Sequence, residues 1–357
     1  MSANKKFDKI VKNENYIDEN APETEVQPKK ERFYKFRRAD VQKVVKKYEV
    51  GFIPVYVMYA CAFILALVYA VLRSQGAFRG FSENASYVLS VFSDLLIFIV
   101  PALVFRLAYK PLSERSAYFY MRPFSHSYVP FIVISLFLLI FSVASGKFAV
   151  SYFFSPVRQS DMAFVTSKNV LVYILVYAVV PAICEEIFFR GVFQPEIAEK
   201  AGGFTAIFMS AFAFALIHLD LAYFPVYFIS ALILAAVAHV SSSCLPSMIL
   251  HAIYNVFSVY FSPRLTFIES EKIGISFILI IFTIVSLIFL LLWLRQIEKL
   301  CMKKSVEATV HSGKVKFYTS PFRLKSDTGY TFHKLLRYVF SPVMILAVTA
   351  FFLINLL

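Results

Sequence analysis

Charged residues are scarce in this sequence. They make up 17% of its 357 residues, whereas about a quarter of the residues in an ordinary soluble domain are charged. Hydrophobic residues make up 59%, which is more apolar surface than a water-soluble fold of this length can hide from water. The composition therefore disfavours a soluble protein and predicts that most of the surface faces lipid.

Glycine and cysteine are also rare, and the motifs of several hydrolytic enzymes are missing. With only 10 glycines, the sequence lacks the Gly-interrupted half-helices that are common in secondary transporters, which weakens a carrier hypothesis without excluding it. The four cysteines form no CxxC pair, so we expect free thiols. There is neither an HExxH motif, typical of zinc proteases, nor a GxSxG nucleophile elbow.

Long apolar runs fill most of the chain after residue 50. A transmembrane helix needs about 20 mostly apolar residues, and nine segments fit this description, at residues 53–72, 87–105, 128–145, 170–189, 204–219, 221–240, 246–260, 273–294 and 338–357. The runs are continuous, whereas the strands of a membrane barrel alternate between apolar and polar residues. The sequence therefore predicts an all-α, polytopic transmembrane helical bundle of about eight to nine spans.

Basic residues lie mainly on one side of these predicted spans. If the N-terminus is cytoplasmic, 29 of the 36 Lys and Arg residues fall in cytoplasmic segments, as the positive-inside rule requires. Nine of them lie between Lys29 and Lys47, beside the first span, interleaved with aromatic residues. Such a tract can bind single-stranded nucleic acid, but next to a membrane we expect it to bind anionic lipid. No nucleic-acid partner is predicted.

Ionisable residues inside membrane spans are rare and indicate functional sites, because each is costly unless it is paired or hydrated. In this chain they are concentrated between residues 181 and 255, in the fourth, fifth and seventh predicted spans. Three short motifs hold them: Glu185, Glu186 and Arg190; Phe214 and His218; and His251 and Asn255. A chain otherwise poor in intramembrane polar groups therefore has one candidate site.

Helical spacing assigns partners within these motifs. Glu186 and Arg190 are four residues apart and can form an ion pair on one face of the helix. Glu185 is rotated by about 100° from its neighbour, which leaves it without that partner. His251 and Asn255 are also four residues apart, so an imidazole and an amide share one face.

The depth of the groups in the membrane can also be compared. An antiparallel turn at residues 202–203 would bring Glu185 and His218 to a similar depth, roughly 22–26 Å from the turn, provided that the helix continues through Pro195. Phe214 lies one turn before His218 and can orient its ring by packing. The two ionisable groups can therefore face each other.

These residue types suit the hydrolysis of an amide bond. A carboxylate and an imidazole, such as Glu185 and His218, can together deprotonate a water for attack on a carbonyl carbon. His251 and Asn255 can then donate hydrogen bonds to the developing oxyanion, worth about 3–4 kcal/mol per donor. Spacing alone does not choose Glu185 over Glu186 as the base.

Other interpretations of the same residues stay open. Glu185, His218 and His251 together resemble a His₂Glu zinc set, which ranks second to a metal-free site without a cofactor. Buried Glu and His residues can also relay protons in a transporter. The pair of Glu186 and Arg190 can be purely structural.

The three motifs resemble those of a known family. Glu185-Glu186-Ile-Phe-Phe-Arg190 fits EExxxR, Phe214-Ala-Leu-Ile-His218 fits FxxxH, and His251-Ala-Ile-Tyr-Asn255 fits HxxxN, in that order along the chain. This is similar to the CPBP intramembrane glutamic endopeptidases, the CAAX-processing and bacteriocin-processing enzymes that are also called the Abi family. The resemblance covers roughly residues 170–260.

The resemblance implies a fold and a set of roles. The fold would be a helical bundle with a conical catalytic cavity that opens from the membrane. Glu185 and His218 would activate water, while His251 and Asn255 would form the oxyanion site. The supporting residues would be Glu186, Arg190 and Phe214. The family also includes bacteriocin-immunity proteins and scaffolds without known cleavage, so a non-catalytic protein is the alternative.

These observations together predict the organisation of the chain. Residues 1–50 form a basic cytoplasmic tail, 51–168 the N-terminal transmembrane helices, and 169–262 a CPBP-like catalytic core. Residues 263–357 form the C-terminal transmembrane helices, with a basic cytoplasmic loop at 295–337. We expect a multi-pass protein of a prokaryotic cell membrane that cleaves a membrane-associated or lipid-modified peptide.

Overall fold

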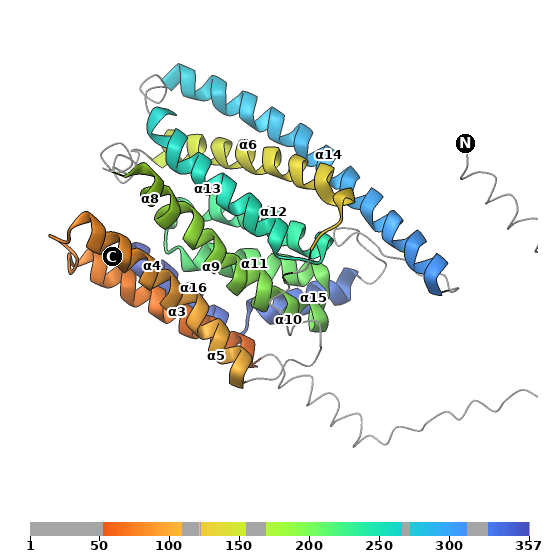
Figure 1. Cartoon of the computed structure of the whole chain (residues 1–357), viewed down its shortest axis with the longest axis horizontal. Helices are drawn as coiled ribbons and strands as arrows, with labels where there is room; N and C mark the ends of the chain where they lie inside the picture. The colour runs from red at the N-terminus through yellow and green to blue at the C-terminus, as the bar shows by residue number, and fades with distance from the viewer. Residues whose placement is uncertain are drawn as a thin grey trace, which may run out of the picture. The chain divides into compact units, whose positions relative to one another are not determined.

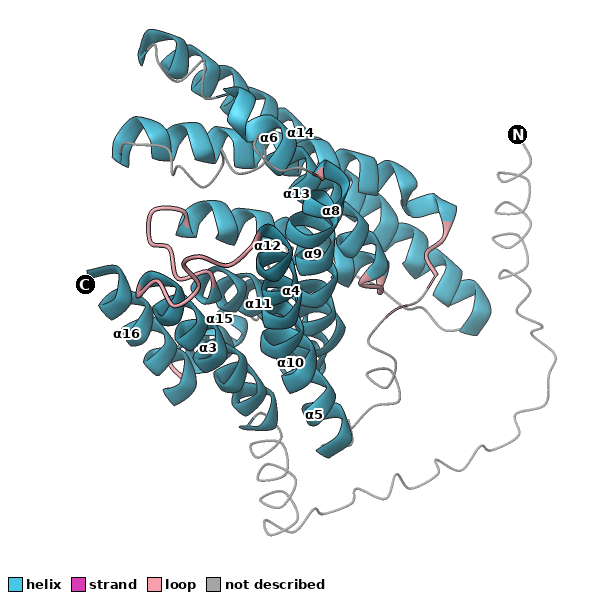
Figure 2. Cartoon of the chain, turned by 60° about the vertical axis from the view of Figure 1, so that its left-hand side comes forward, coloured by secondary structure: helices cyan, strands magenta, loops and turns pink. Residues whose placement is uncertain are grey.

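The computed structural model describes residues 53–108, 121, 123–154, 169–265, 272–312 and 328–356. Within these ranges the chain is helical and contains no strand (Figures 1 and 2). The first elements are α3 (Ile53–Ser74), α4 (Glu83–Asp94), η2 (Leu95–Ile99), α5 (Val100–Ala108), η4 (His126–Tyr128) and α6 (Val129–Phe154). One continuous helical stretch follows: α8 (Val170–Ile174), η6 (Leu175–Val179), α9 (Val180–Phe188), η7 (Phe189–Phe193) and α10 (Gln194–Ala201). The remaining elements are α11 (Gly203–Ile217), α12 (Phe224–Ser241), α13 (Leu245–Leu265), α14 (Lys272–Ser312), α15 (Thr328–Val339) and α16 (Pro342–Leu356).

The chain divides into two units, Met1–Lys46 and Lys47–Leu357. All of the described residues belong to the second unit, so the predicted basic tail at residues 1–50 lies outside them. The four cysteines are free.

Apolar helices match the predicted spans. Among the described residues, six helices are long and apolar enough to cross a membrane: Pro54–Ser74, Glu83–Ala108, His126–Val150, Val170–Ala201, Phe224–Ser241 and Ser276–Glu307. Three shorter apolar helices, Gly203–Ile217, Leu245–Val259 and Pro342–Leu356, correspond to the other predicted spans. The prediction of an all-helical membrane bundle is confirmed.

Proline positions explain why two of the spans contain π-turns. The π-turns are η2, η6 and η7, and each ends two residues before a proline, namely Pro101, Pro181 and Pro195. Proline lacks the N–H of a helical hydrogen bond, and its ring clashes with the carbonyl four residues earlier. In each π-turn the carbonyl of its first residue instead accepts from the N–H five residues later, which widens the helix there. The helix therefore passes through Pro181 and Pro195 without ending.

The segment 295–337, for which the sequence predicts a loop, is helical at all of its described residues, 295–312 and 328–337. α14 extends to Ser312, and α15 begins at Thr328. Residues 295–312 contain neither glycine nor proline, and several of them are Lys or Glu, which favour helix. Ile297 and Leu300 are buried on the same face as Trp293. The prediction of a loop is therefore wrong at residues 295–312, because the helix continues where the apolar run ends.

Aromatic side chains pack α14 against α6. The ring of Phe289 stacks on Phe137 and Phe141, with centroids 5.2 and 5.8 Å apart. Trp293 is buried, and its indole N–H donates to the hydroxyl of Ser135 at 2.9 Å. Only 6% of the most apolar stretch of α14 is buried inside the protein. The opposite face of α14 is therefore available to lipid.

A close approach of α11 and α12 predicts a measurable packing effect. A Cβ atom added at Gly203 would overlap the imidazole ring of His239. We expect Gly203→Ala to lower the free energy of unfolding by about 1–3 kcal/mol, because overpacking forces side chains from their rotamers. In a His239→Ala background the same change should be neutral or stabilising. Thermal unfolding in detergent measures both, and an equal loss in the two backgrounds would contradict this packing.

Candidate active site

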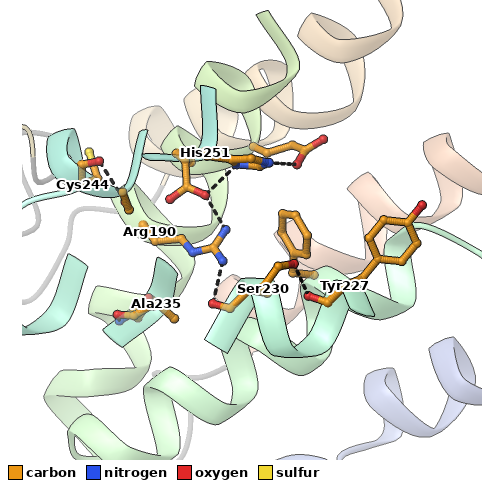
Figure 3. A network of polar contacts seen from close by, with 12 residues as sticks. Arg190, Tyr227, Ser230, Ala235, Cys244 and His251 are labelled. Carbon is orange, nitrogen blue, oxygen red and sulfur yellow. Dashed lines mark hydrogen bonds and ion pairs between the residues drawn. The ribbon is translucent and has the colours of Figure 1, made fainter. Parts of the chain in front are cut away.

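Three helices carry the predicted site residues. Glu185 and Glu186 lie on α9, His218 is the C-cap of α11, and α13 carries His251 and Asn255. Figure 3 shows the polar network that joins these helices to α12. Residues more than 60 positions apart in the sequence therefore meet in one place.

Packing between α11 and the stretch from α9 to α10 supports the predicted register. The helix is continuous from residue 170 to residue 201, as the depth estimate requires. The rings of Phe189 and Phe214, which lie at similar distances from the turn at residues 202–203, are 5.2 Å apart. The two helices therefore run antiparallel about that turn, which brings His218 toward the level of Glu185.

Glu186 is fully buried and lies between Arg190 and His251, two of the residues labelled in Figure 3. Its Oε1 atom accepts from Arg190 Nη1 at 2.8 Å and from His251 Nδ1 at 3.0 Å. The guanidinium and the imidazole therefore engage this carboxylate from two different helices. The ion pair that the spacing of Glu186 and Arg190 predicts is therefore present, and His251 adds a second partner.

Glu185 lies in a different environment from its neighbour. It is buried, with 9% of its surface exposed. Its Oε2 atom is 3.8 Å from His251 Nε2, which is longer than a hydrogen bond. His251 thus lies between the two carboxyls, with Nδ1 bound to Glu186 and Nε2 facing Glu185. This geometry makes Glu185 the better candidate for a base, a choice that spacing alone does not make.

Two side chains of the continuous helix at residues 170–201 form hydrogen bonds with α12. Arg190 Nη2 donates to the carbonyl of Ala231 at 2.9 Å, and Gln194 Nε2 donates to the carbonyl of Ala235 at 2.8 Å. Both donors and both acceptors are four residues apart, so the two bonds repeat at successive helical turns. The small side chains of Ala231 and Ala235 let the helices approach closely. Gln194 is a supporting residue that the motifs do not contain, although its position four residues after Arg190 could have indicated it.

The ring of Phe214 touches the other parts of the site. Its centroid is 4.8 Å from the guanidinium carbon of Arg190, 4.6 Å from the centroid of the His218 ring and 5.8 Å from that of His251. A cation over an aromatic face is attracted by the ring quadrupole. Phe214 therefore links the ion pair to both imidazoles, in addition to packing on His218 as predicted.

His218 is oriented by two contacts in addition to the ring of Phe214. Its Nδ1 is 2.8 Å from the carbonyl of Phe214. Since a carbonyl only accepts, Nδ1 carries the proton, and Nε2 is left with a lone pair that can accept one. Its ring also stacks on Tyr227, with centroids 4.0 Å apart. The motifs do not contain Tyr227, and the aromatic composition of α12 gives no signal that would single it out.

Asn255 lies one turn beyond His251 on α13. Its Nδ2 donates to the carbonyl of Ala178 in the π-turn η6, at 3.2 Å. The π-turn that precedes Pro181 therefore has a direct contact with a predicted site residue. Because an amide nitrogen carries two hydrogens, the second remains for another acceptor.

Asp94 is a residue to which the sequence assigns no role, although it too lies in an apolar span. It comes directly before the π-turn η2 and interacts electrostatically with Glu185 and Cys184. One oxygen of its carboxyl group is buried without a hydrogen-bond partner. The site therefore has a third acidic side chain near Glu185 and Glu186.

The alternative of a zinc site can be compared with this geometry. Among the described residues, no group of three His, Cys, Asp or Glu side chains is placed to hold a metal ion. His251, one of the three candidate ligands, has Nδ1 engaged by Glu186 and Nε2 directed to Glu185. His218 has Nδ1 bound to the backbone. Histidines that bind zinc also hold their second nitrogen in this way, so the grouping of the side chains, and not these bonds, disfavours a ligand set among the described residues.

Comparison with known proteins agrees with the motifs. Residues 167–257 match the family model described as type II CAAX prenyl endopeptidase Rce1-like. No curated protein and no solved structure matches the chain. The match spans α8 to α13 up to Phe257, and so contains the predicted site residues. The predicted resemblance to the CPBP and CAAX proteases is thereby confirmed: residues 167–257 of this multi-pass membrane protein are similar to the Rce1-like CAAX proteases.

Proposed function

We propose that this chain is an intramembrane endopeptidase that hydrolyses a peptide bond of a membrane-associated or lipid-modified protein, using a water activated by Glu185 and His218. The observation that carries this proposal is the different environment of two adjacent carboxyls. Glu186 is engaged by Arg190 and His251, whereas Glu185 has no hydrogen bond to either. A protein that needed only structural ion pairs would have no use for the second buried carboxyl.

The proposed reaction assigns one task to each group. Glu185 and His218 Nε2 orient a water, and Glu185 accepts its proton as the oxygen attacks the carbonyl carbon. His251 donates from Nε2 to the oxyanion as an imidazolium, since its Nδ1–H is already donated to Glu186, and Asn255 donates from its amide. Removal of a single such donor costs about 3–4 kcal/mol of transition-state stabilisation in other hydrolases. Glu185 then returns the proton to the leaving nitrogen as the C–N bond breaks. Glu186 and Arg190 hold the geometry.

The substrate class follows from the place of the site and from the matched family. The candidate base lies on an apolar helix of the bundle, so the scissile bond must reach it from the membrane. The matched family model is named for CAAX prenyl endopeptidases, which supports a prenylated CAAX sequence in the substrate. We therefore propose a lipid-modified peptide as substrate, a cytoplasmic N-terminus, and a basic tail that binds anionic lipid. A farnesylated peptide with a C-terminal CAAX sequence is the first probe.

Mass spectrometry of membrane peptides tests the proposed function in cells. Cells that carry the native chain should contain cleaved products that are missing from cells with Glu185→Gln, which is nearly isosteric. Glu199→Gln is the matched control, because Glu199 is an exposed carboxyl on the same continuous helix and should leave the products unchanged. Identical peptides with the native chain and Glu185→Gln would favour a non-catalytic scaffold or immunity protein and would refute the proposal.

Removal of metal ions separates the metal-free site from its zinc alternative. We expect the purified chain to keep its full rate on the farnesylated peptide after treatment with a strong chelator, because the proposed water is activated by side chains. Elemental analysis of the same sample should show no stoichiometric zinc. Loss of activity on chelation that zinc restores would overturn the metal-free mechanism.

A further inference from the structure

The turn that follows His218 has an unfavourable backbone conformation. His218 is the C-cap of α11, and the next residue, Leu219, has a φ of 54°. Only glycine, and to a lesser degree Asn or Asp, adopts this left-handed region readily, because the Cβ of other residues crowds the backbone. Such a conformation is unfavourable in free energy and persists only where the surrounding structure enforces it.

The C-terminal helix α16 supplies the enforcing contacts. The Asn355 side chain donates its Nδ2–H to the carbonyl of Leu219 at 3.3 Å, and its Oδ1 accepts from the backbone N–H of Leu221 at 3.0 Å. One amide group thus holds the backbone on both sides of Asp220. The same Nδ2 also donates to the carbonyl of Phe351, at 2.8 Å, which fixes the Asn355 side chain on its own helix.

Aromatic contacts connect α16 to the imidazole ring of His218. Phe351, buried one turn before Asn355, packs on Phe224 at the start of α12, with centroids 5.6 Å apart. Tyr227, on the next turn of α12, stacks on the His218 ring. α16 therefore contacts both the turn that follows His218 and the helix α12, whose Tyr227 ring stacks on the His218 ring.

We propose that Asn355 is a positioning residue of the active site, which fixes the orientation of His218 by holding the strained turn at residues 219–221. This role rests on the proposed function of His218. Asn355 lies nearly 100 residues beyond the end of the segment that matches the family model. The C-terminal region is thereby assigned a part in the chemistry of the matched domain.

Replacement of Asn355 should slow the reaction without weakening substrate binding. Asn355→Leu keeps the size of the side chain and removes all three hydrogen bonds. We expect kcat on the farnesylated CAAX peptide to fall about 10- to 100-fold, because a small misplacement of a catalytic group has effects of this size. KM should change less than twofold. Thr349→Val is the control and should leave kcat unchanged, because the hydroxyl that it removes donates to the carbonyl of Ile345 within α16.

A second-site substitution distinguishes positioning from general loss of packing. Glycine adopts a φ near 54° without cost, so Leu219→Gly should restore most of the kcat of the Asn355→Leu variant. Failure of Leu219→Gly to raise the rate would refute the positioning role, since a packing defect in α16 would not respond to a glycine at residue 219.

The decisive measurement reads His218 directly and does not depend on activity. In the full-length chain labelled with ¹⁵N-histidine, the His218 imidazole resonance is assigned by its loss in His218→Asn. We expect this resonance to shift in Asn355→Leu and to return toward its native position in the double variant with Leu219→Gly. An unchanged resonance in Asn355→Leu would overturn the inference, whereas full cleavage by Glu185→Gln would overturn the proposed function instead.

Discussion

Glu185→Gln is expected to lower the rate of peptide cleavage by about 10²- to 10⁴-fold, the range that a general base contributes in enzymes. The amide keeps the shape of the side chain but cannot accept the proton of the attacking water. The fold should be unaffected, because Arg190 and His251 Nδ1 bind the neighbouring Glu186, while Glu185 Oε2 lies 3.8 Å from His251 Nε2, beyond hydrogen-bond distance. Initial rates on the farnesylated peptide, together with thermal unfolding of the same samples, measure both effects.

His218 should act as one unit with Glu185. His218→Asn is expected to produce a loss of similar size, and the double variant should be little worse than either single variant, because residues that act in one step are strongly non-additive. Losses that multiply in the double variant would show that the two side chains serve separate steps and would contradict joint activation of one water.

Arg190→Leu is expected to lower the free energy of unfolding by about 3–5 kcal/mol, because removal of one partner leaves the other charge buried and unpaired. The guanidinium joins the buried Glu186 to the carbonyl of Ala231 and lies over the ring of Phe214. Loss of the guanidinium therefore disturbs three helices together. Denaturation in mixed micelles measures the change.

Two further variants show whether this loss comes from the buried ion pair. The double variant Glu186→Leu with Arg190→Leu should recover much of the stability, since a buried pair can often be replaced by apolar groups. Lys303→Leu is the matched control: Lys303 and Glu307 have the same four-residue spacing, but their side chains are 53% and 61% exposed. That change should cost less than about 1 kcal/mol. An equally small effect of Arg190→Leu would contradict the structural role of the pair.

The helical bundle and most of the site follow from local properties of the sequence. Apolar runs about 20 residues long predict the spans, and the four-residue spacing of Glu186 and Arg190 predicts the ion pair at 2.8 Å. The end of α14 was harder to predict, because a basic stretch marks the edge of a membrane but does not stop a helix. Ile297 and Leu300 continue the buried face of α14 beyond the apolar run.

Contacts between distant segments of the chain determine the features of the site that the spacing of residues does not predict. Glu185 and Glu186 are adjacent and chemically identical; Arg190 engages Glu186 from the same helix, and His251 reaches it from another helix at 3.0 Å. Asn355 holds a backbone turn more than 130 residues earlier in the chain. Such pairs are set by the way in which helices pack, and neither periodicity nor a local motif encodes which residues meet.

Product analysis with the purified chain tests the central claim most directly. The full-length protein is placed in lipid vesicles, treated with a chelator, and incubated with the farnesylated CAAX peptide, whose products are identified by mass. The account predicts that the native chain and Glu199→Gln release the C-terminal fragment, whereas Glu185→Gln releases almost none. Equal release by the native chain and Glu185→Gln would contradict water activation by Glu185.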